Sequence, residues 1–110
     1  MSEKRLGKIT AAEFGFGGYD DAMIGLSISL GGSGWGTGDF KGMWAHKEVP
    51  SRAQWTEESR KTKLGEAVLF LRDLLSAAKV RHVGELVGFP IEAIFIDAKL
   101  VSWRVLEEVL

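Results

Sequence analysis

Residues 22–30 alternate between large apolar and small side chains, and this alternation constrains the fold more than any other feature of the sequence. One set of alternate positions holds Ala22, Ile24, Leu26, Ile28 and Leu30, and the other holds Met23, Gly25, Ser27 and Ser29. A period of two is typical of a β-strand with one buried face. We therefore expect the apolar face in the core. The Gly and Ser face is flat enough for another subunit or a ring to approach closely, or for a helix or strand of the same chain to pack there.

Glycine is concentrated around this strand, since ten of the 14 Gly lie between Gly15 and Gly42. Residues 31–38 include five Gly, which predicts a loop that reverses the chain and presents Trp35. No Gly-Lys-Ser/Thr follows the loop and it leads into a strand, so the phosphate-binding loop of a nucleotide hydrolase is excluded. Two interpretations of Trp35 stay open: an exposed interface anchor or base-stacking platform, or a side chain folded onto its own sheet.

The remaining elements follow from periodicity and capping signals. We expect strands at 6–16, 39–44, 91–96 and 100–106, a helical turn at 83–86, and one helix from about Glu57 to Lys79 with Thr56 as its N-cap. The order β-β-β-α-β-β predicts an α+β fold, with one long helix packed on a largely antiparallel sheet. The length of 110 residues is that of a single domain, which we expect to span residues 1–110.

Composition excludes several classes of protein. The formal net charge is −1, so strong binding to nucleic acid is not expected. The chain has no Cys, which excludes disulfides and thiolate metal sites. No apolar run approaches the ~20 residues that span a bilayer, and no signal peptide is recognisable at the N-terminus. These features predict a cytoplasmic protein without a membrane partner.

Candidate site residues combine aromatic rings with nearby charges. Basic residues interleaved with Trp between positions 41 and 63 are typical of a nucleotide pocket or a single-strand binder, although a solvated helix start with loop charges is the simpler explanation. The candidates for ligand or partner binding are Tyr19, Trp35, Asp39, Lys41, Trp44, His46, Arg52 and Arg60. Neither the two His nor the carboxylates show the spacing of a metal site or a catalytic triad, so no metal, no cofactor and no enzymatic activity is predicted.

Glycine and aromatic residues also recur in a spaced pattern over most of the chain. Residues 13–19 read EFGFGGY, residues 34–40 read GWGTGDF, residues 86–92 read LVGFPIE and residues 102–110 read SWRVLEEVL. The pattern resembles a family of small uncharacterised proteins of bacteriophages and prophages. The resemblance implies a phage or prophage origin and transfers no functional residue. Small phage proteins that are not enzymes often occupy a host component, so the resemblance favours a role against host defence.

These observations lead to one main functional hypothesis and its alternatives. We expect a phage binding protein that assembles as a homo-oligomer and sequesters an anionic, nucleotide-type signal. The main alternative is a protein–protein inhibitor or adaptor of a host complex. A replication accessory protein that contacts single-stranded nucleic acid is a third hypothesis.

Overall fold

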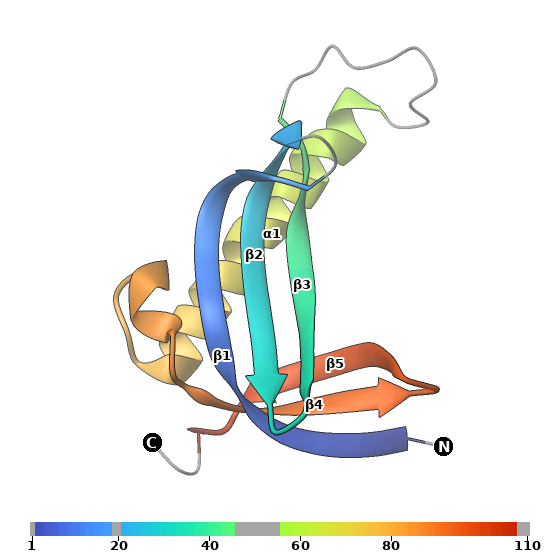
Figure 1. The fold of residues 1–110 in the computed structure, drawn as a ribbon. Coiled ribbons are helices and arrows are strands. Elements are labelled where there is room, and N and C mark those ends of the chain that lie inside the picture. Colours follow the sequence, from blue (N-terminus) through green and yellow to red (C-terminus); the bar gives the residue numbers. More distant parts are fainter. Residues whose placement is uncertain (1, 19–20, 46–55, 108–110) are drawn as a thin grey trace.

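The computed structural model describes residues 2–18, 21–45 and 56–107, which form one sheet, one long helix and one short 3₁₀ helix (Figure 1). The elements in chain order are β1 (Ser2–Gly17), β2 (Met23–Gly32), β3 (Trp35–Trp44), α1 (Glu57–Ala78), η2 (Val83–Leu86), β4 (Pro90–Ile96) and β5 (Lys99–Val105). The predicted α+β fold and the order β-β-β-α-β-β are confirmed.

All neighbouring strands of the sheet are antiparallel, and their order is β3-β2-β1-β4-β5. The long strand β1 lies at the centre and holds two hairpins together. Its first half, from Ser2 to Lys8, pairs with β4, whereas its second half, from Lys8 to Gly17, pairs with β2. The register shifts between Ile9 and Ala11, so Thr10 is an extra residue in the ladder. Such a bulge bends a strand, and Figure 1 shows β1 turning at this point from the β2–β3 hairpin toward the β4–β5 hairpin.

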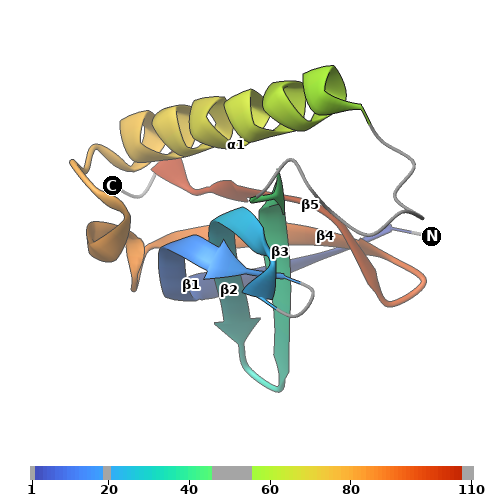
Figure 2. The same ribbon diagram turned by 90° about the horizontal axis from the view of Figure 1, so that it is seen from above.

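The core lies between the sheet and α1, which crosses one face of the sheet (Figure 2). The alternation of β2 produces this arrangement, because Leu26, Ile28 and Leu30 are all buried. They pack with side chains from β1, β4, β5, η2 and the helix, of which the most buried are Ile9, Ile91, Ala93, Ala78 and Leu86. No helix in the described part of the chain is long and apolar enough to cross a membrane.

The predicted loop over residues 31–38 is wrong. Strand β2 continues to Gly32 and β3 begins at Trp35, so only Ser33 and Gly34 remain as a tight turn. Gly34 has a φ of 78°, which glycine adopts without strain. The other glycines of this segment lie in paired strands, and at Gly32 the absence of a Cβ leaves space for the Trp35 ring and the Leu6 carbonyl.

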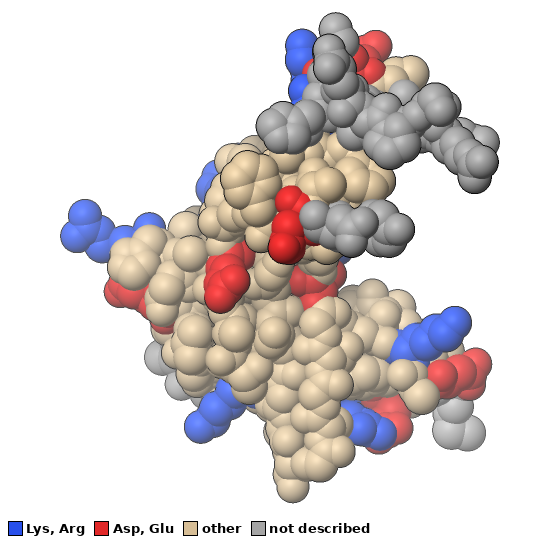
Figure 3. Space-filling model, turned by 45° about the horizontal axis from the view of Figure 1, so that its top comes forward, with Lys and Arg blue, Asp and Glu red and all other residues tan. Residues whose placement is uncertain are grey.

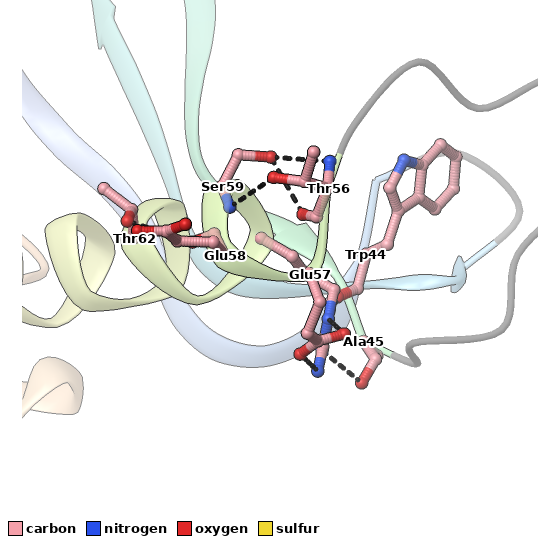
Figure 4. Close-up of polar contacts among 8 residues, drawn as sticks. Trp44, Ala45, Thr56, Glu57, Glu58, Ser59 and Thr62 are labelled. Atoms are coloured by element: carbon pink, nitrogen blue, oxygen red, sulfur yellow. Dashed lines mark hydrogen bonds and ion pairs between the residues drawn. The ribbon is translucent and has the colours of Figure 1, made fainter.

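Helix α1 ends one residue earlier than expected, at Ala78, and begins as predicted after Thr56. The Thr56 hydroxyl accepts a hydrogen bond from the backbone N–H of Ser59, and the Ser59 hydroxyl accepts one from the backbone N–H of Thr56 (Figure 4). This reciprocal cap satisfies two donors that the first turn of a helix otherwise leaves open. The start of α1 is thereby fixed close to the end of β3.

Candidate functional site

The face of β1, β2 and β3 that points away from α1 is made largely of glycine and serine. Cross-strand pairing places the following residues on this outer face: Gly15, Gly17, Gly25, Ser27, Ser29, Gly31, Gly36, Gly38 and Gly42. No helix of the described residues covers it, and it faces the viewer in Figure 1. In Figure 3 the same region is mostly tan, with red Asp and Glu side chains within it and the blue Lys and Arg side chains at the margins of the molecule. The flat face expected from the sequence is therefore not covered by the helix, although Gly25 on it is buried.

Aromatic rings cover part of this glycine surface. A Cβ added at Gly42 would lie 2.7 Å from Cζ of Phe40, and one added at Gly17 would lie 3.8 Å from Cε1 of the same ring. By contrast, a Cβ at Gly15 would have no neighbour within 4 Å. Glycine is thus required at Gly42 by the Ile24 backbone oxygen, which a Cβ would meet first, and by the Phe40 ring, while Gly15 faces open space.

Trp35 is half-buried and folded onto its own sheet, the second of the two arrangements left open by the sequence. Its ring meets Phe95 of β4 edge to face, with centroids 5.5 Å apart. A Cβ at Gly7 would lie 2.7 Å from Cζ2 of Trp35, and one at Gly32 would collide with the indole nitrogen. Trp35 therefore packs between β1 and the β2–β3 hairpin.

An open hollow of about 700 Å³ lies where β1 bends beside the hairpin. Residues of β1, of the end of β2, of the turn and of the start of β3 line it: Leu6, Gly7, Lys8, Thr10, Leu30, Gly31, Gly32, Ser33, Trp35 and Gly36. Leu6 at its rim is 68% exposed although it is a large apolar residue. The only ionisable side chain of the lining is Lys8. The hollow is thus suited to apolar side chains and backbone rather than to a highly charged ligand.

Asp39 and Lys41 lie together on β3, on the side that faces α1 and β5. The Asp39 carboxylate accepts a hydrogen bond of 2.7 Å from the indole N–H of Trp103 on β5. The Lys41 ammonium lies 3.7 Å from the other Asp39 oxygen and 5.3 Å from the centroid of the Phe70 ring. Strands β3 and β5 are the outermost strands of the curled sheet. These contacts therefore join the two edges of the sheet to each other and to α1.

A second hollow, of about 490 Å³, runs between this part of β3 and α1. Its lining consists of Phe40, Lys41, Gly42, Met43, Lys63, Glu66, Ala67 and Phe70. Lys63 forms an ion pair of 3.4 Å with Glu66, and Lys41 faces Asp39. Each cation of this hollow therefore has a carboxylate beside it.

Trp44 and Arg60 meet where β3 ends and α1 begins. The Arg60 guanidinium forms two hydrogen bonds with the Glu57 carboxylate, of 2.6 and 3.1 Å, and donates to the backbone oxygens of Trp44 and Ala45. Figure 4 shows the Trp44 and Ala45 carbonyls beside this part of the helix. The hydrogen bond with Glu57 raises the pKa of Arg60 above its ordinary value, against the lowering effect of partial burial. Arg60 thus holds the helix start to β3.

The predicted site residues do not form one cluster. Asp39 and Lys41 are in contact, Trp44 and Arg60 are in contact, and Trp35 lines the hollow at the other end of β3. Tyr19, His46 and Arg52 lie outside the described residues. The sequence analysis did not select Leu6, Lys8, Phe70 and Trp103 as site residues. Only Leu6 could have been found from the sequence, because it is an apolar residue at a strand position expected to be exposed.

Within residues 2–18, 21–45 and 56–107, no group of three or more His, Asp or Glu side chains is placed to hold a metal ion. Comparison of the chain with protein-family models, with curated proteins and with solved structures gives no match. The resemblance to a family of phage proteins therefore stays a prediction, and functional inference rests on the geometry of these surfaces.

Proposed function

We propose that this protein is a non-enzymatic binding protein that docks a segment of a partner protein in the hollow at the bend of β1. The observation that carries the proposal is the hollow itself, an open space of about 700 Å³ with an exposed Leu6 at its rim and the Trp35 ring in its wall. A concave surface lined mainly by apolar atoms, with a few polar groups, is the usual form of a binding site. This corresponds to the adaptor or inhibitor hypothesis rather than to the nucleotide hypothesis.

The chemistry of the lining supports a protein partner. A general acid and base, or a nucleophile with its base, requires two ionisable groups in contact, and the hollow has Lys8 alone. A nucleotide polyphosphate carries several negative charges, which one Lys balances only in part. The flat glycine surface beside the hollow lets the backbone of a partner approach closely. In this proposal Trp35 forms part of the wall of the hollow, and the side chain that inserts into the hollow belongs to the partner.

Peptides selected from a random display library on the wild-type protein test this proposal. We expect Leu6→Ser to weaken their binding by about tenfold or more, because Leu6 supplies exposed apolar area at the rim. The matched control is Val101→Ser, which removes an aliphatic side chain of similar exposure from β5, outside the hollow. Equal binding to both variants and to wild type, or failure of the library to yield binders, would contradict the proposal.

A second candidate function is the sequestration of an anionic nucleotide-type ligand, for which the hollow between β3 and α1 is the best site. Its lining combines the Phe40 and Phe70 rings with two Lys, although each Lys has a carboxylate beside it. A panel of mono-, di- and cyclic nucleotides should then raise the melting temperature of wild type more than that of Lys41→Ala. No shift at millimolar nucleotide would remove this candidate.

A further inference from the structure

The first half of β1 carries Lys and Leu in alternation on the face of the sheet that points away from the core. Lys4, Leu6 and Lys8 occupy alternate positions, and all three side chains are exposed. Gly7, between Leu6 and Lys8, pairs with Ile91 of β4, which is fully buried. Because successive side chains of a strand point to opposite faces, Leu6 lies between two ammonium groups on the outer side of the sheet.

The positive charge of these two Lys is not balanced within the described part of the chain. Glu92 of β4 faces Leu6 across the ladder, but its carboxylate is paired at 3.4 Å with Arg104 of β5. No carboxylate of the described residues forms an ion pair with Lys4 or Lys8. The two ammonium groups are therefore available to an anionic partner.

The acidic side chains of β1 lie elsewhere. Glu3 points to the opposite face and forms an ion pair of 2.9 Å with Arg5. Glu13 lies beyond the bend, on the glycine and serine face, where it is opposite Ser27 of β2. The bend at Thr10 thus separates a basic part of the outer surface of β1 from a part that carries one negative charge.

We propose that the partner segment docked at the hollow is acidic, with an apolar side chain against Leu6 and carboxylates beside Lys4 and Lys8. This inference rests on the proposed function, because it names the chemistry of the same partner. Lys4 and Lys8 are four residues apart, which is about 13 Å along a strand. An extended segment with an acidic residue two positions to either side of an apolar one presents its side chains at the same spacing. Each carboxylate then meets one ammonium group.

This distribution of charge favours a peptide over other anions. The phosphates of a nucleotide are adjacent to one another, whereas the two ammonium groups are spread along the strand. Single-stranded nucleic acid binds through aromatic rings as well as cations, and the apolar side chain between the two Lys is aliphatic. A flat lipid surface does not enter a hollow, whereas a side chain of a peptide does. An acidic peptide segment matches both the hollow and the charges beside it.

Charge reversal tests the inference with the peptides selected from a random display library on the wild-type protein. We expect these peptides to be enriched in Asp and Glu two positions to either side of an apolar residue. Lys4→Glu and Lys8→Glu should each weaken binding by about fivefold, because a carboxylate then faces a carboxylate. The matched control Lys61→Glu makes the same change at an exposed position of α1 and should leave binding unchanged. A peptide whose acidic residues are replaced by Lys should prefer Lys8→Glu over wild type.

The outcomes separate this inference from the docking proposal. Binding that Leu6→Ser weakens but the two charge reversals do not would overturn the acidic partner and leave docking at the hollow standing. Failure of the library to yield binders would overturn both. Vesicles containing phosphatidylserine that bind wild type but not Lys4→Glu, without enrichment of acidic peptides, would overturn the inference by assigning these Lys to a membrane.

Discussion

The two halves of β1 each pair with one neighbour and so each have one unpaired edge, but their surroundings differ. Beside the first half, a Cβ at Gly7 would collide with the Gly31 carbonyl, and one at Gly32 would lie 2.8 Å from the Leu6 carbonyl. The hairpin of the same chain thus closes on this edge. Beside the second half, no strand of the described chain pairs with residues 11–17 on the side away from β2. The bulge at Thr10 therefore leaves a hollow beside the first half of β1, whereas η2 lies beside β1 on the side away from β2 (Figure 1).

The comparison shows that the role of a glycine depends on its neighbours. In the first half of β1, Gly7 is needed because the Trp35 ring and the hairpin backbone occupy the space of a side chain. In the second half, Gly15 has free space around it and contributes flatness. The first kind of glycine stabilises this chain's own packing, and the second leaves a surface open for other molecules.

The same substitution in the two halves should give the largest contrast in stability. Gly7→Ala should lower the free energy of unfolding by about 2 kcal/mol or more, because the added Cβ forces the hairpin or Trp35 to move. Gly15→Ala should raise it by about 0.5 kcal/mol, since the methyl group meets nothing and restricts the unfolded chain. Urea unfolding measures both. Equal changes in the free energy of unfolding for Gly7→Ala and Gly15→Ala would contradict this difference between the two halves of β1.

The link between the two hairpins should give a smaller effect. The Trp103 indole donates to Asp39, whose side chain is only 19% exposed, and this bond joins β5 to β3. Trp103→Phe keeps an aromatic ring against Phe70 but leaves that carboxylate without the indole donor, which should cost about 1–2 kcal/mol. Asp39→Asn retains an acceptor for the indole and serves as the milder control. A loss below the error of urea unfolding would show that the hairpins do not depend on this link.

Sequence pattern predicted the parts of the fold that local rules determine. The alternation of β2, the Thr56 cap and the order of elements depend on near neighbours in the chain, and the structure has all three. The bend of β1 was missed, because residues 6–16 read as one regular strand and nothing at Thr10 marks a bulge. The glycine-rich segment was interpreted as a loop because glycine permits reversals, whereas here β2 continues to Gly32, β3 begins at Trp35, and Gly32 makes space for the Trp35 ring.

The candidate sites depend on contacts between distant positions and could be predicted only in part. Asp39 and Lys41 were selected for their charge, but their partners Trp103 and Phe70 lie far along the sequence and are brought near by the curl of the sheet. Arg60 was selected as a phosphate ligand, yet a carboxylate three residues earlier and the carbonyls of Trp44 and Ala45, at and just after the end of β3, surround it. The sequence alone does not show that the fold places hydrogen-bond acceptors of the same chain around a basic residue such as Arg60.

Hydrogen exchange of the backbone amides, measured with and without a peptide selected on the wild-type protein, tests the difference between the two halves of β1 most directly. We expect amides around the hollow, within residues 6–10 and 30–36, to become more protected when the peptide is bound, because the docked segment covers them. Amides within residues 11–17 should exchange at the same rate with and without the peptide, since they do not line the hollow. Protection that does not change around the hollow, or that changes only in residues 11–17, would contradict the account.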